Sequence, residues 1–377
     1  MSEGVTTITV LTPAGRGAVA SISVDGPQAV PLVESYLLPA SGLAMRDRPP
    51  GSIVFGRWIT SEAGPGEELV VCRLGDERVE VHCHGGVAAV EAIADSLVDG
   101  GAIRQESADW VHSDSSDLIQ AEAHLALAEA KTERTALILL DQFHGAMRRE
   151  VMAILALLEC EELSLAAERL SLLTERMPVG LHLTTPWRIA ISGPPNAGKS
   201  SLMNALIGYS RSIVFDQPGT TRDLVTAHTA FDGWPTQLID TAGLRQTDDP
   251  LESAGIDQAL RAVRDADLEL LICDATEFLY TTAEQRSVPP RIIVVNKVDL
   301  VDRQNFSRPG VKVSAKTGRG LPQLMNEVVA ALIGPYPTSG DPVPFTPRQV
   351  ALLRAASCAV ESASIKNAAD CLKQLVG

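Results

Sequence analysis

Hydrophobic and polar positions along the chain change their spacing near residues 117, 186 and 337. Before the first of these points, short β-rich runs alternate with glycine and proline turns. The runs are TTITVL, AVASISV, GSIVFGRWI, EELVVCRL and ERVEVHC. Runs of this kind, bounded by turn residues, are typical of strands. We therefore predict an α+β domain over residues 1–116.

The next segment, residues 117–185, is rich in Ala, Leu and Glu and almost free of Gly and Pro. Its apolar residues recur at intervals of three and four, which predicts helices with one buried face. A turn-rich connector, GPYPTSGDPVPFTP, leads into a last helical stretch. We expect residues 337–377 to pack back on the earlier helices and to complete one helical domain, with the thiols of Cys358 and Cys371 on the last helix.

Residues 186–336 alternate between strand-like and helix-like runs, beginning with the strand WRIAISG. This alternation predicts an α/β domain with a mostly parallel sheet. The expected fold is therefore multidomain, with an N-terminal α+β domain, a helical domain and an α/β domain inserted between the two parts of the helical domain.

The strongest chemical signal is GPPNAGKS, from Gly193 to Ser200, which follows a predicted strand and opens the predicted helix KSSLMNALIG. This is the phosphate-loop pattern of nucleotide-binding proteins, and the coincidence of strand, loop, Lys-Ser pair and helix disfavours a plain glycine turn. Gly193 and Gly198 let the main chain curl so that N–H groups face phosphate oxygens. Lys199 is expected to reach the β and γ oxygens, and the Ser200 hydroxyl to bind Mg²⁺. Further nucleotide contacts are expected from Asn196, Ala197 and Ser201.

Two motifs for the γ-phosphate and Mg²⁺ follow. DTAG begins at Asp240, directly after the apolar run TQLI, so Asp240 can hold Mg²⁺ through water and the Gly243 amide can meet the γ-phosphate. GTTRD lies between this motif and the phosphate loop, and Thr221 rather than Thr220 is favoured to close over Mg²⁺. Thr241 and Ala242 are expected to add nucleotide contacts.

Two further motifs predict the base. NKVD follows the strand RIIVV, and the Asp299 carboxylate can accept hydrogen bonds from N1 and N2 of guanine, a donor pair that adenine lacks. Lys297 can cover the base. SAK follows the strand VKV and supplies a backbone donor for guanine O6. The residues expected at the base are Asn296, Lys297, Asp299, Ser314, Ala315 and Lys316. Five motifs in this order predict a Ras-like P-loop GTPase that uses GTP and Mg²⁺.

The group that positions the attacking water is not evident from these motifs. Ras-type GTPases use a Gln directly after D-x-x-G, but Leu244 stands there. The acidic residues Asp248, Asp249 and Glu252 follow closely and could do this work. They could equally be favourable charges in the first turn of a helix, and the residues alone leave both readings open.

Taken together, GPPNAGKSSLMNAL, QPGTTRD, DTAGLRQTDDPLESAGI, NKVD and SAKTGRGL resemble the MnmE (TrmE) family of tRNA uridine modification GTPases, in the TrmE-Era-EngA group. The segments TPAGRGAVA, VEVHCHGG and DLIQAEAHLALAEAKTE are similar to that family's N-terminal and first helical signatures. The resemblance implies a GTP-hydrolysing switch in the modification of the wobble uridine of tRNA.

The resemblance also implies roles for single residues and partners. Asn196 matches a ligand of K⁺, which stimulates hydrolysis when two G domains meet. Glu252 matches the residue that orients the catalytic water, so Glu252, Asn196 and Gly243 are the expected catalytic residues. The N-terminal domain is expected to bind 5-formyltetrahydrofolate and to form a homodimer. An MnmG-like FAD protein is expected to supply most of the contacts to tRNA.

The sequence departs from the family at its end. Family members end in Cys-x-Gly-Lys, whereas this chain ends in CLKQLVG, with Cys371 six residues from the last one. An Arg-x-Ser-Gly pattern near the N-terminus is replaced by SVDG. These departures support an alternative function, a diverged regulatory or assembly GTPase that has lost the tRNA chemistry.

The composition limits which partners the protein can bind and in which compartment it is expected to act. The 377 residues include 47 Asp and Glu against 32 Lys and Arg, a net charge of −15, which excludes a protein that coats RNA with a basic surface. The six cysteines form no CxxC pair, which predicts free thiols in a reducing compartment. Neither a signal peptide nor a long uncharged apolar run is evident, so a cytoplasmic protein without membrane attachment is expected.

Two other segments were candidates for ligand binding. His82 and His84 should point to one face of a strand and Cys83 to the other, so the three side chains are not expected to bind one metal ion. We expect this segment to be a structural strand end or the edge of a folate pocket instead. Arg16, between two glycines, suits an anionic ligand or a subunit contact, although a plain β-turn fits nearly as well.

Overall fold

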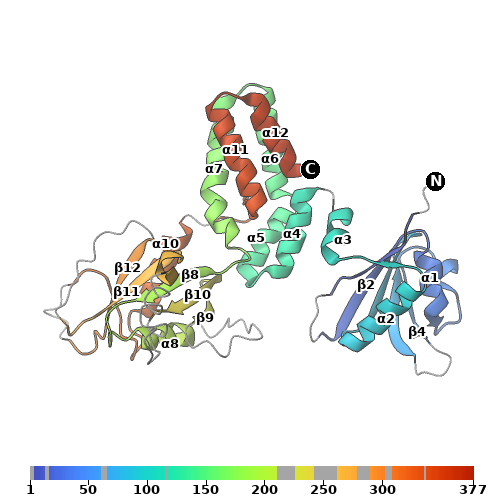
Figure 1. The fold of residues 1–377 in the computed structure, drawn as a ribbon, viewed down its shortest axis with the longest axis horizontal. Coiled ribbons are helices and arrows are strands. Elements are labelled where there is room, and N and C mark those ends of the chain that lie inside the picture. Colours follow the sequence, from blue (N-terminus) through green and yellow to red (C-terminus); the bar gives the residue numbers. More distant parts are fainter. Residues whose placement is uncertain are drawn as a thin grey trace, which may run out of the picture. The chain divides into compact units, whose positions relative to one another are not determined.

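The computed structural model describes residues 4–12, 17–60, 66–115, 117–209, 226–241, 261–277, 289–301, 308–334 and 337–377. The chain divides into two compact units, Met1–Ser115 and Ser116–Gly377 (Figure 1). Each unit is described separately below.

The first unit is built on a seven-stranded sheet in its described residues, in the order β3-β4-β5-β6-β2-β1-β7. The strands are β1 (Thr7–Val10), β2 (Val19–Asp25), β3 (Leu37–Pro39), β4 (Ser52–Trp58), β5 (Glu67–Arg73), β6 (Arg78–His84) and β7 (Ile103–Arg104). All neighbouring strands are antiparallel except β1 and β7, which are parallel. The five runs that predicted strands all form them.

Helices pack on one face of this sheet. The helices on this face are α1 (Ala29–Tyr36), the 3-10 helix η1 (Met45–Asp47) and α2 (Val87–Asp99). The helix α3 (Ser107–Asp114) contacts the opposite face, where Trp110 donates to Asp25. Apolar side chains of α1 and α2 share a core with alternate strand residues such as Val54, Val71 and Val81, which are buried. Their neighbours Ile53 and Phe55 are 69% and 54% exposed, so β4 presents apolar side chains on the opposite face.

The alternation predicted for the histidine segment is confirmed. Cys83 lies in the core of the first unit at 3% exposure, whereas His84 is exposed and His82 is half-buried on the other face. The His82 Nδ1 lies 2.8 Å from the Ser21 hydroxyl. Across the described residues, no three His, Cys, Asp or Glu side chains are grouped so that they could hold a metal ion. The six cysteines are free, as expected.

The second unit contains a helical bundle, and the segment predicted to be helical forms several of its helices. The bundle helices are α4 (Leu118–Glu129), α5 (Glu133–Phe143), α6 (Ala146–Glu159), α7 (Leu163–Leu181), α11 (Pro347–Glu361) and α12 (Ile365–Val376). Local caps set the starts: Asp117 accepts from the Gln120 N–H at 2.9 Å, and Thr132 and Thr135 form a capping box.

The last stretch packs back on the earlier helices, as expected, with α11 against α7 and α12 against α6. The expectation of a single last helix is wrong, because the chain turns after Glu361 and Ala363 has a left-handed φ of 55°. Cys358 therefore lies on α11 and Cys371 on α12.

The connector is bound along the bundle. The Gln142 side chain donates to the Asp341 carbonyl at 3.0 Å and accepts from the Val343 N–H at 3.1 Å. A Cβ atom at Gly180 would lie 1.8 Å from the Pro344 carbonyl oxygen, so only glycine permits this approach. These contacts place the start of α11 beside α7.

The α/β part of the second unit has a six-stranded sheet in its described residues, ordered β13-β12-β11-β8-β10-β9. Its elements are β8 (Trp187–Ser192), α8 (Lys199–Tyr209), β9 (Thr226–Phe231), β10 (Trp234–Asp240), β11 (Leu268–Asp274), β12 (Arg291–Asn296), β13 (Val311–Lys312) and α10 (Leu321–Ile333). Only β9 runs antiparallel to its neighbour, so the predicted mostly parallel sheet is confirmed.

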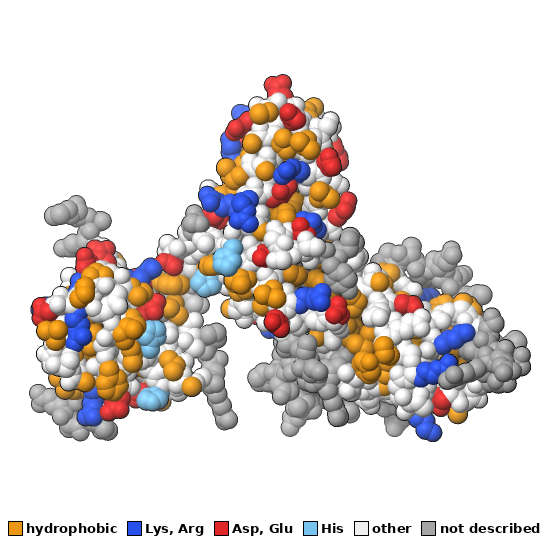
Figure 2. Space-filling view, turned by 180° about the vertical axis from the view of Figure 1, so that it is seen from behind, with side chains coloured by type: hydrophobic (Ala, Val, Ile, Leu, Met, Phe, Trp, Pro, Cys, Tyr) orange, Lys and Arg blue, Asp and Glu red, His pale blue; other side chains and the backbone are white. Residues whose placement is uncertain are grey.

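Charge is mixed over the described surface of the bundle. Figure 2 shows acidic and basic side chains interspersed there, without a continuous basic field among the described residues of that face. No helix within the described ranges combines the length and the apolar character needed to cross a bilayer.

Candidate nucleotide-binding site

Three of the predicted motifs start at one edge of the six-stranded sheet. Parallel strands end at the same edge, and β8, β10, β11 and β12 are parallel neighbours. The phosphate loop follows β8, DTAG starts at the last residue of β10, and NKVD starts at the last residue of β12. Ligands of such sheets bind beyond these strand ends.

The phosphate loop has the backbone that its glycines predict. Gly193 has a φ of 138° and Gly198 a φ of 90°. A Cβ atom at Gly193 would lie 2.2 Å from the Ile272 carbonyl oxygen, and one at Gly198 would lie 2.4 Å from the Asn296 side-chain nitrogen. Asn196 is exposed and has a left-handed φ of 62°. The loop is therefore packed between β11 and the NKVD segment.

The Lys199 side chain lies along this loop. Its Nζ donates to the carbonyl oxygens of Gly193 at 3.1 Å and Pro194 at 2.8 Å, and the residue is 8% exposed. These bonds hold the ammonium against the loop. Phosphate oxygens of a bound nucleotide would be stronger acceptors for it than these carbonyls, because they are charged.

Two of the three residues predicted to hold Mg²⁺, Ser200 and Asp240, contact each other. The Ser200 hydroxyl donates to Asp240 Oδ2 at 2.5 Å, and Asp240 is 3% exposed. Hydroxyl and carboxylate oxygens are ligands that Mg²⁺ accepts, so the donor set fits this ion. Thr241 is fixed behind them because its N–H and hydroxyl both donate to the Ile191 carbonyl, at 3.2 and 2.9 Å.

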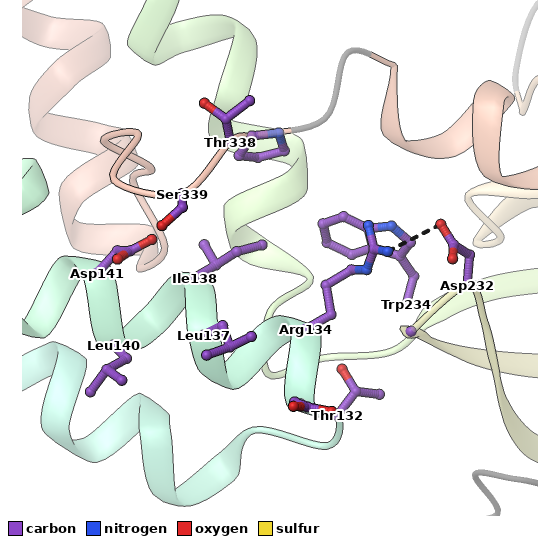
Figure 3. A pocket seen from close by; sticks show the side chains of 13 residues that line it. Thr132, Arg134, Leu137, Ile138, Leu140, Asp141, Asp232, Trp234, Thr338 and Ser339 are labelled. Carbon is purple, nitrogen blue, oxygen red and sulfur yellow. Dashed lines mark ion pairs between the residues drawn. The ribbon is translucent and has the colours of Figure 1, made fainter.

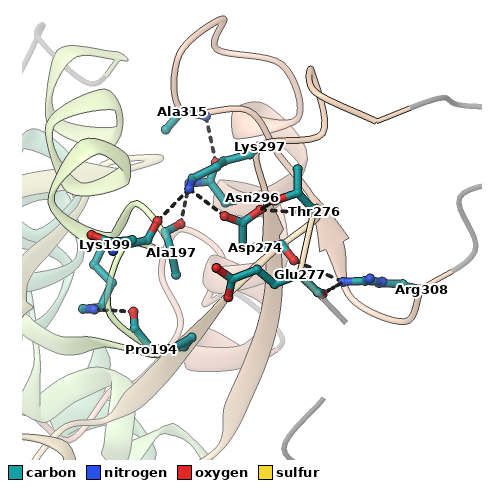
Figure 4. Close-up of polar contacts among 11 residues, drawn as sticks. Pro194, Ala197, Lys199, Asp274, Thr276, Glu277, Asn296, Lys297, Arg308 and Ala315 are labelled. Atoms are coloured by element: carbon teal, nitrogen blue, oxygen red, sulfur yellow. Dashed lines mark hydrogen bonds and ion pairs between the residues drawn. The ribbon is translucent and has the colours of Figure 1, made fainter. Parts of the chain in front are cut away.

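Asn296 joins the phosphate loop to the SAK segment (Figure 4). Its Nδ2 donates to the Ala197 carbonyl at 3.0 Å and its Oδ1 accepts from the Ala315 N–H at 3.0 Å. Asn296 is 2% exposed, so both bonds are sheltered from water. Asn296 and Ala315, two of the residues predicted at the base, are thus bonded to each other, and the Asn296 side chain links the two loops.

Asp299, at the end of the NKVD segment, is exposed to solvent and its side chain favours the ionised form. A hydrogen bond from the Ser314 hydroxyl lowers the pKa of Asp299 below its usual value, and Lys316 adds a smaller effect in the same direction. Ser314 is fully buried, whereas Asp299 and Lys316 are exposed. An ionised, accessible carboxylate is the acceptor that the N1 and N2 donors of guanine require.

Asp274 belongs to the same site, although none of the five sequence motifs includes it. Asp274 ends β11, and its Oδ2 accepts from Lys297 Nζ at 2.6 Å. Lys297 also donates to the Asn196 carbonyl at 2.6 Å. In the sequence, an acidic residue at the end of the apolar run LELLIC is the feature that could have pointed to Asp274. That Asp274 lies at the nucleotide motifs, however, depends on β11 lying between β8 and β12.

Several predicted site residues lie outside the described residues, so their positions stay predictions. They are Thr220, Thr221, Ala242, Gly243 and Glu252. The same holds for Arg16 in the N-terminal glycine segment.

The two glycine segments of the first unit lie against each other. The Gly85 N–H donates to the Ala18 carbonyl at 3.1 Å, and a Cβ atom at Gly85 would lie 2.3 Å from the Gly17 carbonyl oxygen. A cavity of about 240 Å³ adjoins this contact. It is lined by Thr12, Gly17, Gly85, Glu91, Arg104 and Ser107, among others.

A larger cavity, of about 560 Å³, lies away from the nucleotide motifs (Figure 3). It is bounded by α5, the turn between β9 and β10, and residues 337–339. Arg134 crosses it, with its Nη2 3.3 Å from Asp232 and its guanidinium carbon 5.7 Å from the centre of the Trp234 ring. None of the residues predicted to contact the nucleotide lines this cavity. We therefore do not assign it as the nucleotide site, although it is the larger of the two cavities.

A parallel sheet with a phosphate loop after its first strand, a Ser-Asp pair for Mg²⁺ and an NKVD base segment defines a P-loop GTPase. The family described as 50S ribosome-binding GTPase matches residues 188–297. Among curated proteins, the tRNA modification GTPase MnmE of Thermotoga petrophila is 31% identical over 369 residues, covering 85% of this chain and 80% of the relative.

The protein of the same name from Geobacillus kaustophilus is 30% identical over 415 residues, covering 96% of this chain and 90% of the relative. The chain therefore belongs to the MnmE family of tRNA modification GTPases, and the resemblance seen in its motifs is confirmed. Among solved structures, the FeoB G-domain from Methanococcus jannaschii is 23% identical and covers 39% of this chain and 98% of that chain. Its TM-score of 0.30 is too low to support a conclusion about this chain.

Proposed function

We propose that the protein hydrolyses GTP as a switch that controls modification of the wobble uridine of tRNA. The observation that carries this proposal is the convergence of the phosphate loop, the Ser200–Asp240 pair and the NKVD segment at one sheet edge, in a chain that belongs to the MnmE family. That membership over most of the chain supports this function over a regulatory or assembly GTPase without tRNA chemistry.

Within this proposal, GTP is bound by the phosphate loop with Lys199 and by the base segment with Asp299. Bound Mg²⁺ would neutralise charge on the β and γ phosphates, and Ser200, Thr221 and Asp240 would hold it. The Gly243 amide would meet the γ-phosphate. This arrangement is supported by the contact between Ser200 and Asp240.

The proposed hydrolysis depends on Glu252 and Asn196. Glu252 would orient the attacking water, since Leu244 cannot. Asn196 would hold K⁺ near the phosphates when two G domains meet, supported by its exposed position in the phosphate loop. A cation at this place would stabilise the charge that develops in the transition state.

We also propose a homodimer through the first unit. Its sheet carries exposed apolar side chains on the face opposite α1 and α2, with Leu38 at 59%, Ile53 at 69% and Phe55 at 54% exposure. The register places Phe55 opposite Val70 and Ile53 opposite Cys72, so these residues form a continuous apolar strip. Covering such a strip stabilises association through the hydrophobic effect.

The smaller cavity supports a site for 5-formyltetrahydrofolate in the first unit. Arg104 is held by Glu91 through hydrogen bonds of 2.7 and 2.9 Å, so the wall of the cavity presents a guanidinium and a carboxylate. Folates carry both carboxylates and ring N–H donors, which these groups can recognise.

The chain's charge bears on its contact with tRNA. A net charge of −15 and the mixed charges of the bundle surface in Figure 2 leave little attraction for phosphates. An MnmG-like partner carrying FAD is therefore proposed to make most of the tRNA contacts.

The proposed domains are residues 1–116, residues 117–185 together with 337–377, and residues 186–336. We propose that the protein acts in the cytoplasm, and its free cysteines support a reducing compartment.

The test of this function is complementation of a bacterial strain that lacks the wobble-uridine modification. Expression of the chain should restore the modified nucleoside in hydrolysed tRNA, and a Lys199→Ala variant should not. If the wild-type chain hydrolyses GTP but leaves the nucleoside absent in a strain that contains the FAD partner, the regulatory alternative replaces this proposal.

A further inference from the structure

The carboxylate of Asp274 is almost completely buried beside the proposed base-binding segment. Its side chain is 4% exposed, against 32% for Lys297, with which it forms an ion pair at 2.6 Å. Its other oxygen accepts from the N–H and the hydroxyl of Thr276, both at 2.8 Å. Burial by itself opposes the charge, but the bonds from Lys297 and Thr276 outweigh it and lower the pKa of Asp274. The group is therefore a fixed negative charge at neutral pH.

The backbone around Asp274 is held as firmly as its side chain. Its residue pairs with Asn296 across β11 and β12, and the Ala275 N–H donates to the Asn296 carbonyl at 2.9 Å. The Arg308 guanidinium donates to the Asp274 carbonyl at 3.1 Å (Figure 4). The position of the Asp274 carboxylate is therefore fixed relative to Asn296, which directly precedes Lys297.

Lys297 lies between this carboxylate and the phosphate loop. Its Nζ donates to Asp274 Oδ2 and to the Asn196 carbonyl, each at 2.6 Å, while its backbone has a left-handed φ of 64°. With both ends fixed, the four methylene groups span the gap between the loop and the base segment. Such a stem offers apolar surface to a flat ring while its charged end stays bonded elsewhere.

We propose that Asp274 is a positioning residue for guanine nucleotides, which fixes the Lys297 stem as one wall of the base site before the nucleotide binds. The inference rests on the assignment of this site to a guanine nucleotide. A free lysine loses much side-chain entropy when it is ordered, and ordering it in advance removes this cost from binding. The ion pair also keeps the ammonium away from the nucleotide phosphates, where Lys199 already lies.

The test is a double-mutant cycle on the full chain, with dissociation constants for fluorescent GDP as the readout. Asp274→Ala should weaken GDP binding about tenfold, since one ordered side chain accounts for a change of this size. In a Lys297→Ala background the same substitution should change affinity less than about twofold, because the residue through which Asp274 acts is gone. A purely structural role would give the same loss in both backgrounds, and that result overturns the proposal.

Two further variants keep the test decisive. Asp274→Asn retains the shape and an acceptor but not the charge, so it should weaken GDP binding less than alanine does, and it is used if the alanine variant does not fold. Thr276→Ala removes one bond to the same carboxylate and leaves the ion pair, so it should change affinity less than about twofold. Unchanged affinity in both Asp274 variants overturns the proposal, whereas a wild-type chain that binds no GDP overturns the site assignment itself.

Discussion

Arg348 of α11 forms an ion pair with Glu122 of α4 through two hydrogen bonds, Nε to Oε1 at 2.7 Å and Nη2 to Oε2 at 2.8 Å. The same guanidinium donates to the carbonyls of Gln374 at 2.7 Å and Leu375 at 3.1 Å, which have no partner within the last turn of a helix. One side chain therefore joins the first and last helices of the bundle.

Replacing Arg348 by Ala should lower the free energy of unfolding by about 2 kcal/mol, because it leaves the Glu122 carboxylate, 15% exposed, without its cation. Urea-induced unfolding followed by circular dichroism measures this. Arg104→Ala is the matched control, since Arg104 also forms two bonds to one carboxylate, but both side chains are 44% exposed. Equal losses in the two variants would contradict the role of burial.

GTP turnover should depend on the monovalent cation through Asn196. At equal ionic strength, hydrolysis is expected to be about tenfold faster in KCl than in NaCl, because K⁺ would stabilise transition-state charge. Phosphate release measures this. Asn196→Ala should remove the difference, whereas Asn204→Ala, an exposed asparagine on α8, should keep it. Identical rates of the wild-type protein in the two salts would show that Asn196 binds no such ion.

Glu252→Ala should reduce kcat about a hundredfold while GDP affinity stays within about twofold, since the side chain is proposed to act on water rather than on the nucleotide. Single-turnover hydrolysis and nucleotide titration separate the two effects. Asp248→Ala is the control in the same acidic segment and should keep its kcat. If Asp248→Ala loses activity and Glu252→Ala does not, the water-orienting residue has been assigned to the wrong carboxylate.

Acid stability should depend on Asp267, which lies before β11. Burial alone would raise the pKa of Asp267, but hydrogen bonds from the His182 ring and the Arg188 N–H lower it below the usual value. The Arg188 bond is 2.7 Å and the His182 Nε2 lies 3.3 Å from the same oxygen. Because the folded state holds the proton less readily than the unfolded chain, this stabilisation is complete above about pH 4 and is lost as pH falls through the folded-state pKa.

Asp267→Asn is therefore expected to lower the free energy of unfolding at about pH 6, with the difference from wild type shrinking toward about pH 3. Urea titrations at several pH values measure it. A difference that stays constant over this range would mean that the charge of Asp267 does not stabilise the fold.

The strands, the bundle and the nucleotide motifs follow from the sequence because they depend on local patterns. Alternation and turn residues predict β4 and β6, and the capping residues Asp117 and Thr132 precede their helices. The positive φ of Gly193 and Gly198 follows from the phosphate-loop pattern itself. The prediction of guanine likewise follows from a local motif, because NKVD contains a carboxylate that can accept from the guanine donors. The break between α11 and α12 was missed, since no Gly or Pro marks it.

Only the tertiary structure decides which distant side chains meet. Lys297 pairs with Asp274, 23 residues away, because the sheet places β11 between β8 and β12. Arg348 reaches Glu122 across 226 residues because the connector is bound to α5 and α7, which brings the start of α11 to α4. Such pairs depend on strand order and helix packing, which sum many weak contacts over the whole chain, so no local run of residues specifies them.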